Sequence, residues 1–260
     1  VAYVCLGCHP KVVNGYSPEE MHAADSAGSC NLCHLAHESS NSNLLKRPSK
    51  DLCLGCHGKI AEELSSKPAH SVVQNELCTS CHTVHFRKGT TGLISGVPDL
   101  CFRCHEDIKK LVQLAVPHPP ASDGDCIMCH SPHAGTLPED QVEICGSCHD
   151  PDEPAFKTSH FDMSPETCTS CHDPHGSNST KLIRPVLHAP FAEKDCQSCH
   201  SQSVGQKEVT GDDVCLSCHE KPESIGSHDS TSIHGKFCRD CHNPHASDKP
   251  ALVRPQKQTD

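Results

Sequence analysis

The hydrophobic positions of this chain are sparse, and the few periodic runs are short and favour helix. Residues 58–66 (GKIAEELSS) are rich in helix formers, and residues 17–24 (SPEEMHAA) open with a Ser, a Pro and two Glu, as helix starts do. Alternation typical of strands is weak, and Pro-, Gly- and Ser-rich links separate the segments. Residues 106–115 (EDIKKLVQLA) carry one apolar face at helical spacing, formed by Ile108, Leu111, Val112 and Ala115. The pattern predicts mostly irregular coil with short α-helices and little β-structure.

Composition argues against an ordinary apolar core. Hydrophobic residues make up 35% of the 260 positions, a figure that already includes 22 Cys, and aromatic residues only 3%. A chain of this length normally buries many Leu, Ile, Val and Phe side chains. Either the chain is disordered or a bound group fills its interior, and the 22 Cys and 23 His favour a bound group.

Charge and hydropathy indicate where the chain is located and which kinds of partner it does not bind. No apolar run reaches the roughly 18–20 residues that span a membrane, so we expect no transmembrane segment. The first Cys is residue 5, and no leader precedes it, so we expect the numbering of a mature, exported chain. A net charge of −11 without a basic stripe predicts no nucleic-acid partner.

All the cysteines fall into one motif. They form eleven C-x-x-C pairs, each followed at once by His, and none is left over. C-x-x-C-H is the attachment signal of c-type haem: two thiols one turn apart add to the two vinyl groups, and the next His reaches the iron from one face. The sequence therefore predicts eleven c-type haems (haem c, iron), at Cys5-Cys8-His9, Cys30-Cys33-His34, Cys53-Cys56-His57, Cys78-Cys81-His82, Cys101-Cys104-His105, Cys126-Cys129-His130, Cys145-Cys148-His149, Cys168-Cys171-His172, Cys196-Cys199-His200, Cys215-Cys218-His219 and Cys238-Cys241-His242.

Two other uses of paired cysteines fit less well. Structural zinc sites also use C-x-x-C pairs, but they do not need a His directly after the second Cys. Disulfide scaffolds have no use for His at all. Eleven motifs without an exception favour haem over both.

The twelve other histidines supply enough sixth ligands. His is the common sixth ligand of a low-spin haem, and the three Met are too few to replace it. We predict bis-His ligation throughout, with one spare, and favour His228 as the spare. The candidate distal ligands are His37, His85, His133, His175 and His245, three residues after a motif His; His22, His70, His118, His160 and His188, eight residues before a motif Cys; and His234.

The eight-residue word CTSCHDPH (168–175) constrains which iron the second His can reach. His172 and His175 leave the chain on the same side of the haem, so His175 cannot cross to the opposite face of the same iron. We expect it to bind a neighbouring haem. The plainer alternative is that such a His caps a turn or hydrogen-bonds a propionate.

The motifs repeat in pairs. The first motif of a pair is CxxCH without a further His close behind it, and we call it a plain motif. The second motif has another His three residues after the motif His (CxxCHxxH), and we call it a doubled motif. We predict one continuous multihaem chain over 1–260, with two-haem repeats at about 1–48, 49–96, 97–140 and 141–184, a one-haem unit at 185–205 and a two-haem repeat at 206–260. The motif at Cys196 lacks the following His, so its ligation is the least secure.

The phrases HAPFAEKDCQSCH, CTSCHDPHGS and DLCLGCH resemble the multihaem c-type cytochromes with doubled CxxCH motifs, over the whole chain. The resemblance implies an extended, haem-packed architecture with bis-His low-spin haems stacked closely enough for electron hopping. Members act in periplasmic and cell-surface respiration. Some sit in outer-membrane porins, and others polymerise into extracellular filaments.

Haems that are closely spaced and have both axial positions filled predict an electron relay without catalytic residues. We expect long-range electron transfer as an extracellular or cell-surface conduit in anaerobic respiration, with other cytochromes or further copies of the chain end to end, and electron donors and acceptors, as partners. A periplasmic shuttle or a conduit inside an outer-membrane porin is the alternative location. A reductase with one open haem near Cys196 is the enzymatic alternative, and electron storage is the plainest one. Two propionates per haem would make the protein strongly anionic, so end-to-end assembly should be salt-sensitive.

Overall fold

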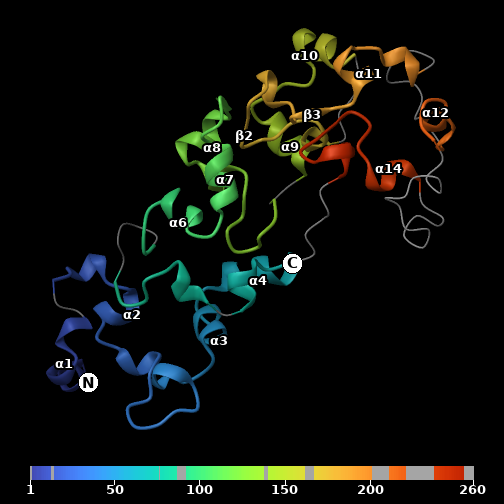
Figure 1. Cartoon of the computed structure of the whole chain (residues 1–260). Coiled ribbons are helices and arrows are strands. Elements are labelled where there is room, and N and C mark those ends of the chain that lie inside the picture. The colour runs from blue at the N-terminus through green and yellow to red at the C-terminus, as the bar shows by residue number, and fades with distance from the viewer. Residues whose placement is uncertain are drawn as a thin grey trace. The chain divides into compact units, whose positions relative to one another are not determined.

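The computed structural model describes residues 2–12, 15–75, 77–86, 92–137, 140–161, 167–200, 211–220 and 237–254. Short helices joined by irregular coil dominate these residues (Figure 1). The predicted fold class is confirmed. The α-helices are α1 (Ala2–Cys8), α2 (Ala23–Ser26), α3 (Ser49–Leu54), α4 (Gly58–Ser66), α5 (Ser71–Gln74), α6 (Asp99–Phe102), α7 (Glu106–Leu111), α8 (Pro119–Asp123), α9 (Gln141–Gly146), α10 (Pro154–Ser159), α11 (Ala189–Ala192), α12 (Asp213–Leu216) and α14 (Cys238–Cys241).

A predicted helix forms over its full range only where no contact with a distant segment competes with the helical conformation. Helix α4 spans the predicted range 58–66. Helix α7 ends at Leu111, earlier than residue 115, because the chain there turns into a sheet. The backbone N–H of Ala115 donates to Asn178 Oδ1 at 3.3 Å, which holds the turn against a segment more than sixty residues away.

The predicted helix over 17–24 is broken into two pieces. A 3₁₀ turn covers Pro18–Glu20, with the side chain of Glu20 accepting from the N–H of Ser17 at 2.9 Å. The chain then extends at Met21, which forms a β-bridge with Phe86. Helix α2 starts only at Ala23, so a long-range pairing overrides the local helix signal.

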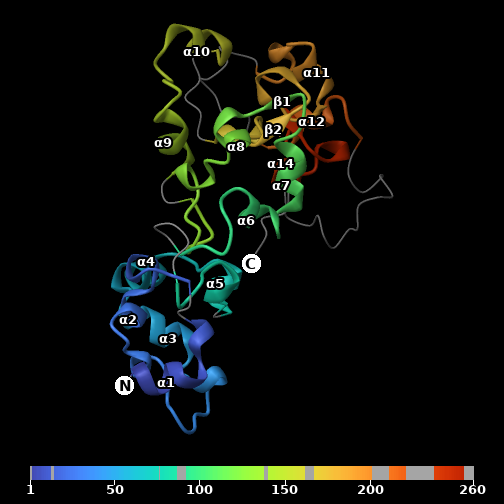
Figure 2. The same ribbon diagram turned by 90° about the vertical axis from the view of Figure 1, so that its left-hand side faces the viewer.

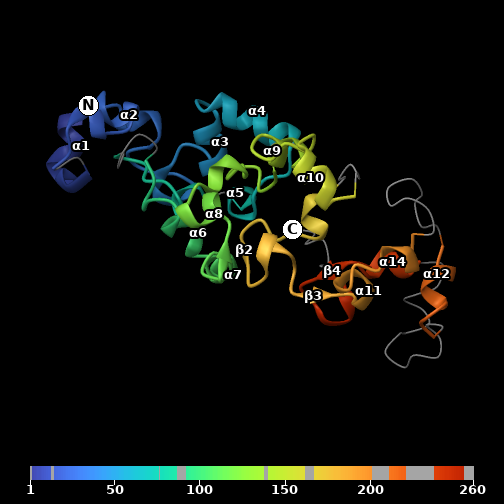
Figure 3. The ribbon, with the colours of Figure 1, turned by 90° about the horizontal axis from the view of Figure 1, so that it is seen from above.

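Two small antiparallel sheets provide the β-structure of the described residues. Strands β1 (Val116–Pro117) and β2 (Gly176–Ser177) pair as Val116 with Ser177 (Figure 2). Strands β3 (Val186–Leu187) and β4 (Ala246–Ser247) pair as Val186 with Ser247 (Figure 3). Each sheet therefore joins a segment before one motif to the segment after a later doubled motif.

Very few side chains are buried in the described part of the chain. The buried hydrophobic residues there are Met21, Ala134 and Ala246, and the buried polar ones are Asp173, Ser177, Asn243 and Ser247. Side chains alone thus do not build an apolar core, as the composition predicted. No helix in the described ranges is long and apolar enough to cross a membrane.

The chain divides into two compact units. The first comprises Val1–Glu106 and Gly124–Pro138, and the second comprises Asp107–Asp123 and Glu139–Asp260. The first unit carries the first six CxxCH motifs and the second carries the last five. The predicted two-haem repeats stay a prediction.

Candidate haem-binding sites

Two backbone conformations present the CxxCH motifs. In the plain motifs the first Cys lies in an α-helix, as in α3 and α12. In most doubled motifs it starts a 3₁₀ turn, as at Cys30–Leu32 and Cys168–Ser170. Both forms bond the N–H of the motif His to the carbonyl of the first Cys, at 3.0 Å for His57 and for His34. This bond brings both thiols and the imidazole close together, as covalent haem attachment requires.

The motif at Cys196 has the doubled-type backbone although the following His is missing. It starts the 3₁₀ turn Cys196–Ser198, and the N–H of His200 bonds to the carbonyl of Cys196 at 2.9 Å. Its backbone, unlike its sequence, thus groups it with the doubled motifs.

Histidine rings face one another in pairs across gaps of the right size for an iron. An axial imidazole nitrogen lies about 2 Å from its metal and about 1 Å from its own ring centre, so two axial rings should have centres about 6 Å apart. Eight pairs of a motif His and another His have ring centres 5.9–6.2 Å apart: His57–His22, His34–His85, His105–His70, His82–His133, His149–His118, His172–His160, His219–His188 and His200–His245. The residues present therefore fit bis-His haems.

The later His of a doubled motif faces a motif His two motifs earlier in the chain. His85 faces His34, His133 faces His82 and His245 faces His200. This geometry agrees with the expectation that the second His of the eight-residue word serves a neighbouring haem.

The His that lies eight residues before a motif usually faces the motif His of the second motif that follows it in the chain, not of the first. His22 faces His57, and His188 faces His219 in the same way. The backbone ties these two kinds of distal His together. The N–H of His22 donates to the carbonyl of His85 at 3.1 Å, and equivalent bonds run from His70 to His133, His118 to His175 and His188 to His245.

His160 departs from this order. It faces His172, the motif His that directly follows it, with ring centres 6.1 Å apart. Its Nδ1 bonds to the carbonyl of Phe156 at 2.9 Å, and the Phe156 ring stacks on it at 4.0 Å. Nothing in the spacing of the sequence distinguishes His160 from the other upstream histidines.

The remaining predicted ligands stay predictions. His9 and His37 face no imidazole within the described ranges, and His37 is exposed whereas its counterparts are half-buried. The roles of His130, His175 and His242 also stay predictions. His228 and His234, and with them the choice of the spare ligand, lie outside the described residues.

Two carboxylates stand behind distal histidines. Glu63 Oε2 lies 3.7 Å from His133 Nδ1, and Asp173 Oδ1 lies 3.3 Å from His175 Nδ1. Burial alone would raise the pKa of Asp173, but hydrogen bonds from His175 and the charge of Arg184 hold that pKa below its usual value. A carboxylate in this position orients an imidazole and makes it a more basic ligand.

Cysteines of successive motifs are neighbours in the first unit. Burial raises the pKa of the Cys53 thiol, and the adjacent Cys78 thiol raises it further. A hydrogen bond between these two thiols contributes to the shift, so they lie in contact; once bonded to haem, these sulfurs no longer titrate. The same relation links Cys30 with Cys5 and Cys101 with Cys126. A charge effect alone, which acts over a longer distance, links Cys33 with Cys56 and Cys81 with Cys104. The first six motifs thus lie near one another in an unbroken series.

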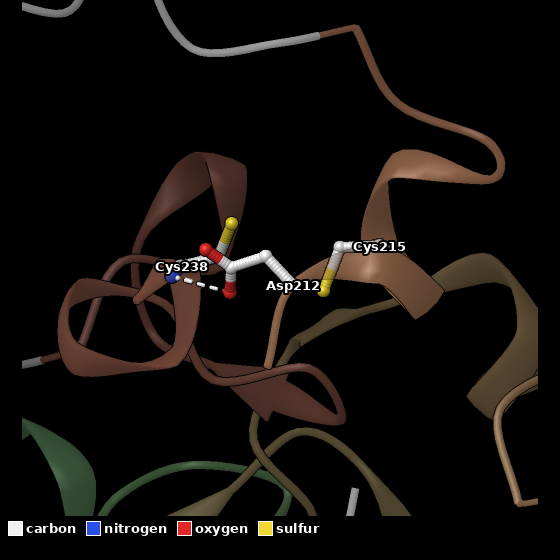
Figure 4. A group of neighbouring side chains, drawn as sticks. All are labelled: Asp212, Cys215 and Cys238. Atoms are coloured by element: carbon white, nitrogen blue, oxygen red, sulfur yellow. Dashed lines mark hydrogen bonds between the residues drawn. The ribbon is translucent and has the colours of Figure 1, made fainter. Parts of the chain in front are cut away.

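The last three motifs form a similar series in the second unit. Burial and Cys215 raise the pKa of Cys199. Cys215, Cys238 and Asp212 place their ligand atoms within 4.8 Å of one another, and Asp212 Oδ1 accepts from the N–H of Cys238 at 3.0 Å (Figure 4). This cluster has the composition of a metal site, but both thiols belong to CxxCH motifs. It lies where two haem-attachment motifs come together.

Sequence reasoning missed the segment that follows a doubled motif. The residue eleven positions after the motif His forms a β-bridge with it in four doubled motifs: His34 with Leu45, His82 with Leu93, His172 with Ile183 and His242 with Val253. The repeated words LLK, LIR and LVR at 44–46, 182–184 and 252–254 were the available signal.

Comparison with known families agrees with these sites. A family profile described as doubled CXXCH motif matches residues 22–62, 70–110, 118–154, 160–185, 188–224 and 232–260. The chain belongs to the doubled CXXCH motif family. It is a multihaem c-type cytochrome whose motifs bind haem covalently. No curated protein is similar enough to count as a match.

The boundaries of the segments matched by the family profile agree with the pairing of the histidine rings. Five of the six matches in this doubled CXXCH motif protein begin at a distal His, namely His22, His70, His118, His160 and His188. In each of these the initial His faces a motif His inside the same match. The family unit therefore begins half a repeat later than the two-haem repeats that the spacing suggested.

Proposed function

We propose that this cytochrome carries electrons over a long distance through eleven bis-His c-type haems. The observation that carries the proposal is the unbroken adjacency of motif cysteines from Cys5 to Cys126. A thioether sulfur is bonded to the edge of its porphyrin, so adjoining cysteines bring successive porphyrin edges together. Each haem supplies a one-electron iron couple, and the chain's residues hold those couples in series.

Paired imidazoles favour electron transfer over catalysis at the haems. A catalytic haem needs an open position for substrate, whereas facing histidines close both faces of an iron. The haem at Cys196, which the sequence marked as the candidate open site of a reductase, has His245 opposite His200 at 6.2 Å. That geometry speaks against the reductase alternative at this haem.

The proposed setting is outside the cytoplasm. Haem attachment to CxxCH supports export, and the cell surface or extracellular space in anaerobic respiration is the location we favour, with the periplasm or an outer-membrane porin as the alternative. Donor and acceptor proteins would meet the ends of the haem series.

Further haem-bearing chains, including copies of this one, are the partners we propose. The support is His37, which is exposed where the equivalent His85, His133 and His245 are half-buried against their partner rings. An exposed imidazole in this register is available to an iron on another haem-bearing chain or segment. Substituting His37→Ala should weaken end-to-end association in light scattering and electron microscopy. Unchanged association would remove His37 from the junction.

The relay is tested by interrupting the series at one haem. Replacing Cys53 and Cys56 by Ala removes the third haem, and replacing Cys5 and Cys8 removes the first haem as a matched control. After a fast pulse of reductant, electrons should redistribute more slowly among the remaining haems in the Cys53/Cys56 variant. The control should keep the rate of the unsubstituted protein. Equal rates in both variants would mean that electrons do not travel along this series.

A further inference from the structure

The segment after a doubled motif returns to the motif His and holds it. We name residues 43–46, 92–94, 181–184 and 251–254 the return turns. Two backbone bonds anchor each one: for the third, Asp173 N–H donates to the Leu182 carbonyl at 2.8 Å and Arg184 N–H to the Cys171 carbonyl at 2.9 Å. Equivalent bonds tie Leu35 to Leu44, Lys46 to Cys33, Thr83 to Gly92, Ile94 to Cys81, Asn243 to Leu252 and Arg254 to Cys241.

The first residue of the return turn contacts the imidazole itself. The Nδ1 atom of His172 lies 2.7 Å from the carbonyl oxygen of Lys181. The equivalent distances are 2.8 Å from His34 to Asn43 and 2.7 Å from His242 to Ala251. A carbonyl only accepts, so Nδ1 carries the proton and Nε2 is left free for iron.

The return turns keep an unfavourable backbone conformation to make this bond. Lys181 and Leu182 have φ of 61° and 58°, and Asn43, Leu44, Ala251 and Leu252 are also left-handed. Each such non-glycine residue is strained and persists only where its surroundings impose the conformation. A serine supplies part of that support: Ser177 and Ser247 donate to the carbonyls of Ile183 and Val253 at 2.6 Å.

Plain motifs lack this arrangement in the part of the chain that the structure describes. Their motif histidines have no protein acceptor at Nδ1 there: His57, His105, His149 and His219. A proximal imidazole that donates to a carbonyl is a more basic ligand, and a more basic ligand stabilises ferric over ferrous iron. The two kinds of motif should therefore bind haems of different reduction potential.

We propose that the return turns at 43–46, 181–184 and 251–254 are haem-tuning elements, which give the haems of His34, His172 and His242 lower reduction potentials than the plain-motif haems. This extends the proposed relay. In residues 5–57 the doubled motif of His34 lies between the plain motifs of His9 and His57, so electrons would rest on the plain-motif haems and pass through the doubled-motif haem between them.

One substitution removes the turn and a matched one keeps it. Proline fixes φ near −65°, so Lys181→Pro cannot hold the left-handed conformation, whereas Lys181→Gly can. In a potentiometric titration of holoprotein loaded with all its haems, Lys181→Pro should shift about one haem in eleven to higher potential. Lys181→Gly should leave the titration unchanged. No shift with Pro, or an equal shift with Gly, would overturn the proposal.

A measurement on the unsubstituted holoprotein decides the case even if the Pro variant fails to load haem. With ¹⁵N-labelled His and fully reduced, diamagnetic haems, Nδ1–H signals of His34, His172 and His242 should exchange slowly with solvent. Those of plain-motif histidines should exchange fast. Uniform exchange would overturn the proposal. Neither readout measures electron transfer between haems, so both can fail while the relay stands, and the relay can fail while they hold.

Discussion

Removing His245 should open the haem of the motif at Cys196. The structure places the His245 ring 6.2 Å from that of His200, with the planes 15° apart, and His245 is half-buried. Two axial nitrogens about 2 Å from one iron would give this separation, and no other imidazole faces His200 among the described residues. His245→Ala therefore leaves this iron with one protein ligand.

The expected magnitude follows from the number of motifs. If each of the eleven motifs carries a haem, about one eleventh of the iron should change from low-spin to high-spin in the absorption and electron paramagnetic resonance spectra. Carbon monoxide binding by the reduced protein should rise by about one molecule per chain. Flash photolysis of the carbon monoxide complex counts that site directly.

Two variants control this measurement. His245→Met keeps a sixth ligand, so it should bind no extra carbon monoxide but should raise the potential of one haem. His37→Ala removes an exposed His at the equivalent place and should open no haem in dilute, unassociated protein. A His245→Ala protein that stays fully low-spin and binds no extra carbon monoxide would refute the assignment of this ring pair.

Three other outcomes follow from the same geometry. A Cβ at Gly176 would clash with the Leu111 carbonyl oxygen, so Gly176→Ala should cost at least about 1–3 kcal/mol of unfolding free energy in denaturant titration; an unchanged midpoint would contradict the β1–β2 packing. The ring planes of His70 and His105 are 72° apart, so the oxidised protein should show a minority of highly anisotropic low-spin resonance signals besides the rhombic signals of near-parallel pairs; a single rhombic class would contradict it. Apoprotein made without haem attachment should give a coil-like circular dichroism spectrum, because side chains alone supply almost no core; a helical spectrum would show a fold independent of haem.

Local signals predicted the parts of the fold that local chemistry determines. The helix over 58–66 formed as its composition indicated, and mostly coil with short helices followed from sparse hydrophobic residues. The helix expected over 17–24 broke at Met21 because that residue pairs with Phe86, sixty-five positions away. Helix α7 stopped at Leu111 for a similar reason, since the chain beyond it pairs with Gly176 and Ser177.

The sequence by itself determined where haem is attached. Covalent attachment needs two thiols and an imidazole within five consecutive residues, and that requirement can be read without knowing the path of the chain. The supply of distal histidines could be counted in the same way.

Only the tertiary structure decided which histidine faces which motif. The partner of His160 depends on how the chain packs, because His160 has the same sequence spacing as His22 and His188 but faces a different motif. The return turns likewise form because backbone groups eleven residues apart meet across a left-handed bend. Spacing records the order of residues along a chain, whereas ligation depends on distance in space.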